Sequence, residues 1–124
     1  MKTATEIMTR HVVTIHPHAT VAEAIRTMRE RQVGSLLVEQ VSPSDTWGII
    51  TQTDVVQKVI ASDKDPAQIR VAEVMSKPIT IVRPDTPVRE CARLMGREHI
   101  RRVFVFERNN VVGIVSASDI FDAL

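Results

Sequence analysis

The chain has 124 residues, of which 44% are hydrophobic and 25% are charged, and its formal net charge is +1. This length suits about one folded body, and the composition is that of an ordinary globular protein. A charge so close to zero gives no long-range field for nucleic acid or a membrane surface, so any anion binding must be local.

The first half of the chain predicts the order helix, strand, helix, strand, strand, helix. The helix expected over Val21–Arg31 has Thr20 as its N-cap and Glu23 as a capping-box partner three residues later. The other elements expected here are a short helix near 5–8, strands at 12–15, 36–39 and 47–50, and a helix over 53–61.

The second half predicts the same order after the polar stretch Ser62–Pro66, whose proline ends the preceding helix. Strands are expected at 79–82, 102–106 and 111–115, and helices over 88–98 and from 118. Asn109 and Asn110 are expected to form the tight turn between the last two strands, because Asn tolerates positive φ.

The two halves are copies of one another, aligned on Pro17 and Pro84 at an offset of 67 residues. Helical apolar faces with i, i+3, i+4, i+7 spacing then match, namely Val21, Ala24, Ile25 and Met28 with Val88, Cys91, Ala92 and Met95. A unit of about 60 residues buries little surface alone. We therefore expect two repeats, at 7–62 and 71–124 with the linker 63–70, that share one core.

Two segments, Gly48–Asp54 and Gly113–Asp119, repeat one signature: Gly, two apolar β-branched residues, a hydroxyl residue, any residue, a hydroxyl residue and Asp. A strand that runs into a helix whose first turn carries hydroxyls and a carboxylate suits the binding of a sugar and its phosphates. The duplication argues against a chance pattern.

The signature carboxylates, Asp54 and Asp119, each offer two acceptor oxygens, which suits the two hydroxyls of a ribose. The alternative is that each stabilises a helix N-terminus behind a cap at Thr53 or Ser118. The duplication favours ribose recognition for at least one of them.

The signature hydroxyls of Thr51 and Ser116 end their strands beside the same helix starts, where free backbone amides favour an anion. They either bridge to phosphate oxygens or act as an additional cap or water ligand. The residues leave both interpretations open.

This pattern resembles a tandem pair of CBS (cystathionine-β-synthase) domains, often called a Bateman module, over Ile7–Leu124. The similarity lies in the duplicated signature, the Met-Thr/Ser start of each repeat and a Pro-x-x-x-Val-x-Glu motif before each long helix. It implies an α/β (α+β) fold of two β-α-β-β-α repeats, packed about a pseudo-twofold axis into one compact module. It also implies two clefts that bind AMP, ADP, ATP or S-adenosylmethionine, and regulation of another protein.

The resemblance further implies that each cleft takes its signature Asp from one repeat and much of its adenine and phosphate surroundings from the other. The first expected cleft contains Ile49, Thr51, Thr53, Asp54, Ser76, Ile79, Thr80, Ile100, Arg101 and Arg102. The second contains Thr9, Val12, Val13, Val33, Gly34, Ile114, Ser116, Ser118 and Asp119. The aliphatic residues that begin strands would clamp adenine, although by sequence alone they are equally core residues.

The two expected clefts differ in charge. Arg101 and Arg102 open a strand, so they point to opposite faces and only one enters a given cleft. Arginine matches phosphate geometry, although adjacent arginines are commonly solvated. The first repeat has Gly34 and Ser35 there, so we expect the Asp54 cleft to prefer phosphorylated ligands and the Asp119 cleft to be weaker, empty or suited to less charged adenosine compounds.

Catalysis and metal binding have little support. His11, His16 and His18 have no cysteine or paired acid nearby, and Cys91 falls on an apolar helix face. No Ser, His and Asp constellation is suggested, so we expect no enzyme, no metal and no catalytic cofactor, with an adenine nucleotide as regulatory ligand.

Partners and location are expected to follow from the same similarity. We expect a homodimer that signals to a regulated protein and binds neither nucleic acid nor membrane. Residues 1–10 lack a signal-peptide apolar region, and no apolar run approaches the roughly 20 residues of a membrane span, so a cytoplasmic location is expected. The alternatives are a structural dimerisation module without ligand and a metal- or nucleic-acid-binding regulator.

Overall fold

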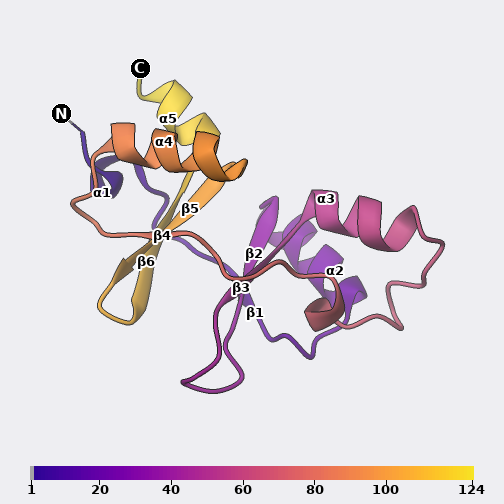
Figure 1. Cartoon of the computed structure of the whole chain (residues 1–124). Coiled ribbons are helices and arrows are strands. Elements are labelled where there is room, and N and C mark those ends of the chain that lie inside the picture. The colour runs from indigo at the N-terminus through magenta and orange to yellow at the C-terminus, as the bar shows by residue number, and fades with distance from the viewer. Residues whose placement is uncertain (1) are drawn as a thin grey trace. The chain divides into compact units, whose positions relative to one another are not determined.

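The computed structural model of the protein describes residues 2–124, which form two compact units (Figure 1). Unit 1 combines the N-terminal segment through Val12 with Thr80–Leu124, and unit 2 contains Val13–Ile79. We call residues 2–12 and 71–79, which precede the first strand of each repeat, the lead-in segments. Each unit therefore joins the sheet of one repeat to the lead-in segment of the other.

Unit 2 contains a three-stranded sheet in the order β1-β2-β3, with β1 parallel to β2 and β2 antiparallel to β3. A parallel pair needs a crossover, and here the crossover is a helix. The elements are β1 (Thr14–Ile15), α2 (Val21–Arg31), β2 (Ser35–Val38), β3 (Gly48–Thr51), α3 (Gln52–Asp54), the π-helical η1 (Val55–Ile60) and the 3-10 helix η2 (Val71–Glu73).

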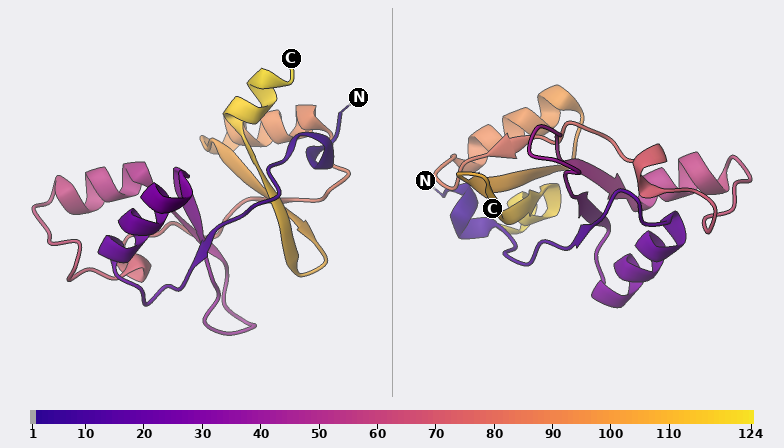
Figure 2. Two further views of the ribbon diagram at one scale, coloured as in Figure 1. Left: turned by 180° about the vertical axis from the view of Figure 1, so that it is seen from behind. Right: turned by 90° about the horizontal axis from the view of Figure 1, so that it is seen from below.

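Unit 1 repeats this topology in the order β4-β5-β6, with β4 parallel to β5 and β5 antiparallel to β6. Helices α4 and α5 contact each other beside the β5–β6 hairpin, and Figure 2 shows the same arrangement from two other sides. The elements are α1 (Ala4–Ile7), β4 (Ile81–Val82), α4 (Val88–Glu98), β5 (Arg102–Glu107), β6 (Asn110–Ser116) and α5 (Ala117–Asp122).

The two long helices confirm the sequence prediction at both ends, and the Thr20 hydroxyl accepts a hydrogen bond from the Glu23 N–H at 3.1 Å. The expected buried face is right for α2 but wrong at one position of α4. Ala92 is exposed, while Leu94 packs against Cys91 and Met95 in the core of unit 1. The larger aliphatic side chain buries more apolar surface, so α4 is turned toward Leu94.

Several element boundaries differ from the sequence prediction. The strands expected at 12–15 and 79–82 contain two residues each, and the last helix of each repeat begins one residue early, at Gln52 and Ala117. The hairpin turn lies at Arg108 and Asn109, because Glu107 pairs with Asn110 and leaves Arg108 to adopt a φ of 59°.

Each unit has its own cluster of buried apolar side chains, and each cluster contains residues from both repeats. The lead-in segment of the second repeat contributes Val71 and Val74 to the cluster of unit 2, and that of the first repeat contributes Ala4 to the cluster of unit 1. Among the described residues, no helix has the length and apolar character needed to cross a membrane.

The lead-in segments pair with the signature strands through short antiparallel bridges. The backbones of Ile49 and Ser76 exchange two hydrogen bonds of 2.9 Å, and those of Thr9 and Ile114 exchange bonds of 2.9 and 3.0 Å. The signature glycine lies next to each bridge, and a Cβ at Gly113 would stand 2.7 Å from Met8 Cγ and 3.1 Å from Met8 Cβ. The glycine is needed for this close approach.

We predict that Gly113→Ala lowers the free energy of unfolding by about 1–3 kcal/mol, because the added methyl group overlaps the base of the Met8 side chain. Gly48→Ala should cost less, since its nearest contact is the movable Met75 sulfur at 2.9 Å. Urea unfolding measures both changes.

Gly96→Ala is the matched control, because a Cβ at this position of α4 meets nothing within 4 Å. It should stabilise the protein by about 0.5–1 kcal/mol through helix propensity. A Gly113→Ala protein as stable as the wild type would contradict the close-approach explanation.

Candidate functional site

Both signature segments end in the same reciprocal hydrogen-bond pair. The Thr51 N–H donates to Asp54 Oδ2 at 2.9 Å, and the Asp54 N–H donates to Thr51 Oγ1 at 3.1 Å. Ser116 and Asp119 repeat the pair at 2.8 and 3.1 Å. The strand thus delivers a capping hydroxyl to the start of the helix, and the carboxylate folds back onto the same residue.

The expectation that Thr53 or Ser118 is the cap is therefore wrong. The first hydroxyl of each signature has the extended backbone of an N-cap, whereas Thr53 and Ser118 lie inside the helices and are exposed. The cap occupies one oxygen of each Asp and leaves the other for a further partner. A hydroxyl that accepts one hydrogen bond also keeps its own O–H as a donor, so capping and ligand contact are compatible.

The second oxygen of the two carboxylates has different surroundings. Lys58 Nζ lies 3.1 Å from Asp54 Oδ1 and donates a 2.9 Å hydrogen bond to the Val74 carbonyl. For Asp119, the described residues provide no ion pair, and its hydrogen bonds are the two with Ser116. Sequence analysis missed Lys58, although its i, i+4 spacing from Asp54 was a visible signal.

Arg101 and Arg102 lie beside the second signature. The Arg101 carbonyl accepts a 2.8 Å bond from the Ala117 N–H, and Arg102 pairs with Ser116 across the sheet. Arg101 is exposed and Arg102 is half-buried. Burial, together with the charge of Arg101, lowers the pKa of the Arg102 guanidinium, which still remains charged at any ordinary pH.

Thr80 is also held in unit 1, where its carbonyl accepts a 2.9 Å bond from the Phe104 N–H. Its hydroxyl donates to Glu98 Oε1 at 2.6 Å. Glu98 is a second residue that sequence analysis missed, because it ends α4 and no motif connects it to position 80. The contact places an acceptor next to a residue expected to surround adenine.

The predicted site residues are divided between the units. Unit 2 contains Val13, Val33, Gly34, Ile49, Thr51, Thr53, Asp54, Ser76 and Ile79. Unit 1 contains Thr9, Val12, Thr80, Ile100, Arg101, Arg102, Ile114, Ser116, Ser118 and Asp119. Both expected clefts draw on both lists, so their composition stays a prediction. Within unit 2 the Gln52 N–H donates to the Gly34 carbonyl at 3.1 Å, which brings Gly34 to the Asp54 turn.

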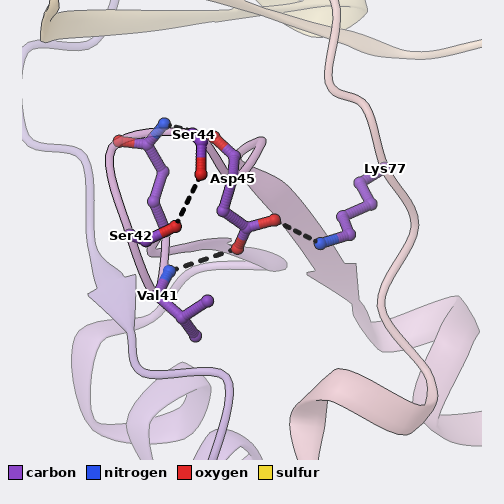
Figure 3. Close-up of polar contacts among 6 residues, drawn as sticks. Val41, Ser42, Ser44, Asp45 and Lys77 are labelled. Carbon is purple, nitrogen blue, oxygen red and sulfur yellow. Dashed lines mark hydrogen bonds and ion pairs between the residues drawn. The ribbon is translucent and has the colours of Figure 1, made fainter.

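An ion pair fixes the lead-in segment of unit 2 beside the loop between β2 and β3 (Figure 3). Lys77 Nζ lies 2.8 Å from Asp45 Oδ1, and Asp45 Oδ2 accepts a 3.1 Å bond from the Val41 N–H. The Lys77 hydrogen bond and then the Val41 N–H lower the pKa of the Asp45 carboxyl below its ordinary value. The contact stabilises the backbone next to Ser76.

The residues weighed for metal binding and reactivity have ordinary local roles. Nδ1 of His16 accepts a 3.0 Å bond from the His18 N–H, and the two rings meet edge to face. Across residues 2–124 no group of three or more His, Cys, Asp or Glu side chains is arranged to hold a metal ion. Cys91 is buried, and desolvation raises the pKa of its thiol, which agrees with a packing role.

Comparison with known sequences identifies a matching family. The chain matches the family described as CBS domain at residues 4–61 and 71–124. The CBS domain-containing protein YhcV of Bacillus subtilis is 32% identical over 120 residues, covering 97% of this chain and 84% of that protein. MK0525 of Methanopyrus kandleri is 34% identical over 116 residues, and the match covers 93% of this chain but 59% of that protein.

Solved structures show the same fold. The hexameric CBS-CP12 protein from bloom-forming cyanobacteria is 44% identical with a TM-score of 0.92, over 98% of this chain and 70% of that one. Hypoxic Response Protein I, solved with two coordinated zinc ions, is 31% identical with a TM-score of 0.79 over 100% of both chains. These similarities confirm the mixed α/β architecture of two repeats.

We predict that Lys77→Met destabilises the protein at pH 7 and that this effect fades in acid. The pKa of Asp45 is lowered in the folded state, so the stability it contributes is present above pH 3.8 and is lost as the pH falls through the lowered value. Thermal unfolding of both proteins between about pH 7 and pH 3 measures the difference.

Lys64→Met is the matched control, because Lys64 is exposed in the linker and its described bond is made by the backbone. It should leave stability within about 0.5 kcal/mol of the wild type. A Lys77→Met penalty that stays constant across the pH range would show that the Asp45 contact is not its cause.

Proposed function

The chain belongs to the CBS-domain family, and we propose that it is a regulatory module that binds an adenosine-containing ligand at its signature turns and signals occupancy to a partner protein. Proteins of this family are generally regulatory ligand-binding modules. The proposed ligands are AMP, ADP, ATP and S-adenosylmethionine. YhcV and the other relatives named above do not have enzyme names, and we propose no catalytic step.

The observation that carries the proposal is the state of Asp119. Its Oδ2 is fixed by the Ser116 N–H at 2.8 Å, while Oδ1 has no hydrogen bond or ion pair within residues 2–124. The carboxylate is thus oriented by the backbone and is only partly exposed. An oriented acceptor with free lone pairs suits the donor hydroxyls of a ribose.

Neighbouring groups in unit 1 support an anionic ligand. Arg102, which the family resemblance assigned to the Asp54 cleft, is the register partner of Ser116 in the β5–β6 pair, so a permanently charged residue neighbours a residue whose hydroxyl can donate. An arginine fork and a hydroxyl are suitable donors for phosphate oxygens. This pairing favours a phosphorylated adenosine compound over adenosine itself.

We predict that millimolar AMP or ATP raises the melting temperature of the protein and that Asp119→Asn removes most of this shift. Asn keeps an acceptor for the Ser116 N–H, so the helix cap survives while the charge and one ribose acceptor are lost. Calorimetric titration should show binding at least about tenfold weaker, since one charge-assisted bond contributes about 1.5–3 kcal/mol.

Asp122→Asn is the matched control, because Asp122 is an exposed carboxylate in the last turn of the same helix. Asp54→Asn tests the other signature turn in the same way. If none of AMP, ADP, ATP and S-adenosylmethionine changes the melting temperature of the wild type, the sensing proposal is wrong.

A second candidate function is self-association without a ligand. Apolar side chains are exposed on or just after the last helix of each repeat: Val56 at 58% and Ile60 at 51% on η1, Phe121 at 73% on α5, and Leu124 at 94% two residues after α5. The cyanobacterial relative is described as hexameric. We propose a homodimer through these helices, and sedimentation with and without nucleotide separates a purely structural role from a ligand-dependent one.

A further inference from the structure

Lys58 connects the first signature turn to the lead-in segment of the second repeat. It extends from η1, and its ammonium group lies 3.1 Å from Asp54 Oδ1 and 2.9 Å from the Val74 carbonyl oxygen. The Asp54 side chain is only 13% exposed, whereas that of Lys58 is 46% exposed. One cation thus bridges a mostly buried carboxylate and a backbone carbonyl on another part of the chain.

The carbonyl that Lys58 binds lies shortly before the place where the chain leaves unit 2. Val74 is buried, and two residues later Ser76 exchanges two hydrogen bonds with Ile49 at the start of the signature strand. The chain passes into unit 1 between Ile79 and Thr80. A change at Lys58 therefore acts on a segment that connects the two units.

In the part of the chain that the structure describes, the turn at Asp119 has no equivalent connection. The residue four positions after Asp119 is Ala123, where the first repeat has Lys58 after Asp54. At the aligned position of Val74 the first repeat has Ile7, whose segment is held by the Thr9–Ile114 bridge. The signature turns thus share a backbone arrangement, and within residues 2–124 only the one at Asp54 is linked by a side chain to its lead-in segment.

We propose that Lys58 is a positioning residue that couples the Asp54 carboxylate to the Val74–Ser76 segment, which makes the Asp54 turn the one that transmits occupancy along the chain. The claim that ligand occupancy is transmitted rests on the proposed function, whereas the coupling of Asp54 to Val74–Ser76 through Lys58 does not. A hydroxyl that hydrogen-bonds to Asp54 Oδ1 competes with Lys58 for the same oxygen, so ligand binding weakens the bridge that Lys58 makes between Asp54 and Val74. Asp119 binds ligand without this effect.

The coupling is tested by amide hydrogen exchange, measured by NMR at Ser76 and Ile49 in the full chain. Lys58→Met should raise exchange at both amides about fivefold, as expected for loss of a partly exposed ion pair and its carbonyl contact. Asp54→Asn should raise it by a similar factor, and the double variant should show no further increase, because either change breaks the same bridge. High salt should raise the exchange of wild type but not of Lys58→Met.

Three controls separate coupling from general destabilisation. Lys58→Arg keeps the charge and should retain most of the protection, and Lys64→Met should change nothing. The amides of Thr9 and Ile114 report the equivalent bridge in unit 1 and should be unaffected by Lys58→Met. Unchanged exchange at Ser76 in Lys58→Met, or additive effects in the double variant, would overturn the coupling.

A second arm adds adenosine, which has a ribose and no phosphate. If adenosine binds, it should raise exchange at Ser76 in the wild type and leave Lys58→Met unchanged, and binding without that difference would also overturn the inference. If no adenosine compound binds to any protein, the proposed function fails, while the variant measurements without ligand still decide whether Lys58 couples Asp54 to Val74–Ser76.

Discussion

The structure depends on the close approach of each lead-in segment to a signature glycine. With hydrogen as its side chain, Gly113 lets Met8 pack against the strand, and Gly48 does the same for Met75. The paired backbone bonds that follow, at Thr9–Ile114 and Ser76–Ile49, hold the lead-in segment of one repeat against the sheet of the other. Each compact unit consequently contains parts of both repeats. A larger side chain at either glycine would therefore disturb the packing of one repeat against the other.

Those bridges also determine which groups surround the signature carboxylates. Ser76 pairs with Ile49, two residues before Thr51, the cap of the Asp54 turn, and Thr9 pairs with Ile114, two residues before the cap Ser116. Duplication reproduced this backbone closely, while the side chains diverged. Asp54 has Lys58 as a counter-ion, whereas Asp119 Oδ1 has no partner among residues 2–124 and Asp119 lies in the unit that contains Arg101 and Arg102. The two turns therefore have the same hydrogen-bond geometry, but in the described part of the chain the carboxylate is neutralised by an ion pair at Asp54 and not at Asp119.

Local patterns predicted the elements and the signature turns, because periodicity and capping residues lie close together in sequence. The prediction failed where two nearby residues were equally suited to one position. Either Thr51 or Thr53 could have been the helix cap, and either Ala92 or Leu94 could have been on the buried face of α4. Pairing between residues far apart leaves no periodic signal, so the exchange of lead-in segments was not visible in the local patterns. The family resemblance alone placed Ser76 with Ile49 and Thr9 with Ile114, and the two bridges agree with it. The Lys58 contact with Asp54 was accessible from spacing, but its contact with Val74 depends on that exchange.

The exchanged lead-in segments impose an order on events during synthesis. Unit 2 is continuous in sequence, so it can assemble while the ribosome is still translating the second repeat. Unit 1 must wait, because α1 and Met8 are made before unit 2 but pack against β6, which is made after it. Until β6 is made, residues 2–12 of the nascent chain lack the strand against which they pack. Unit 1 closes by contacts between residues far apart in sequence, so its folding is expected to be slow.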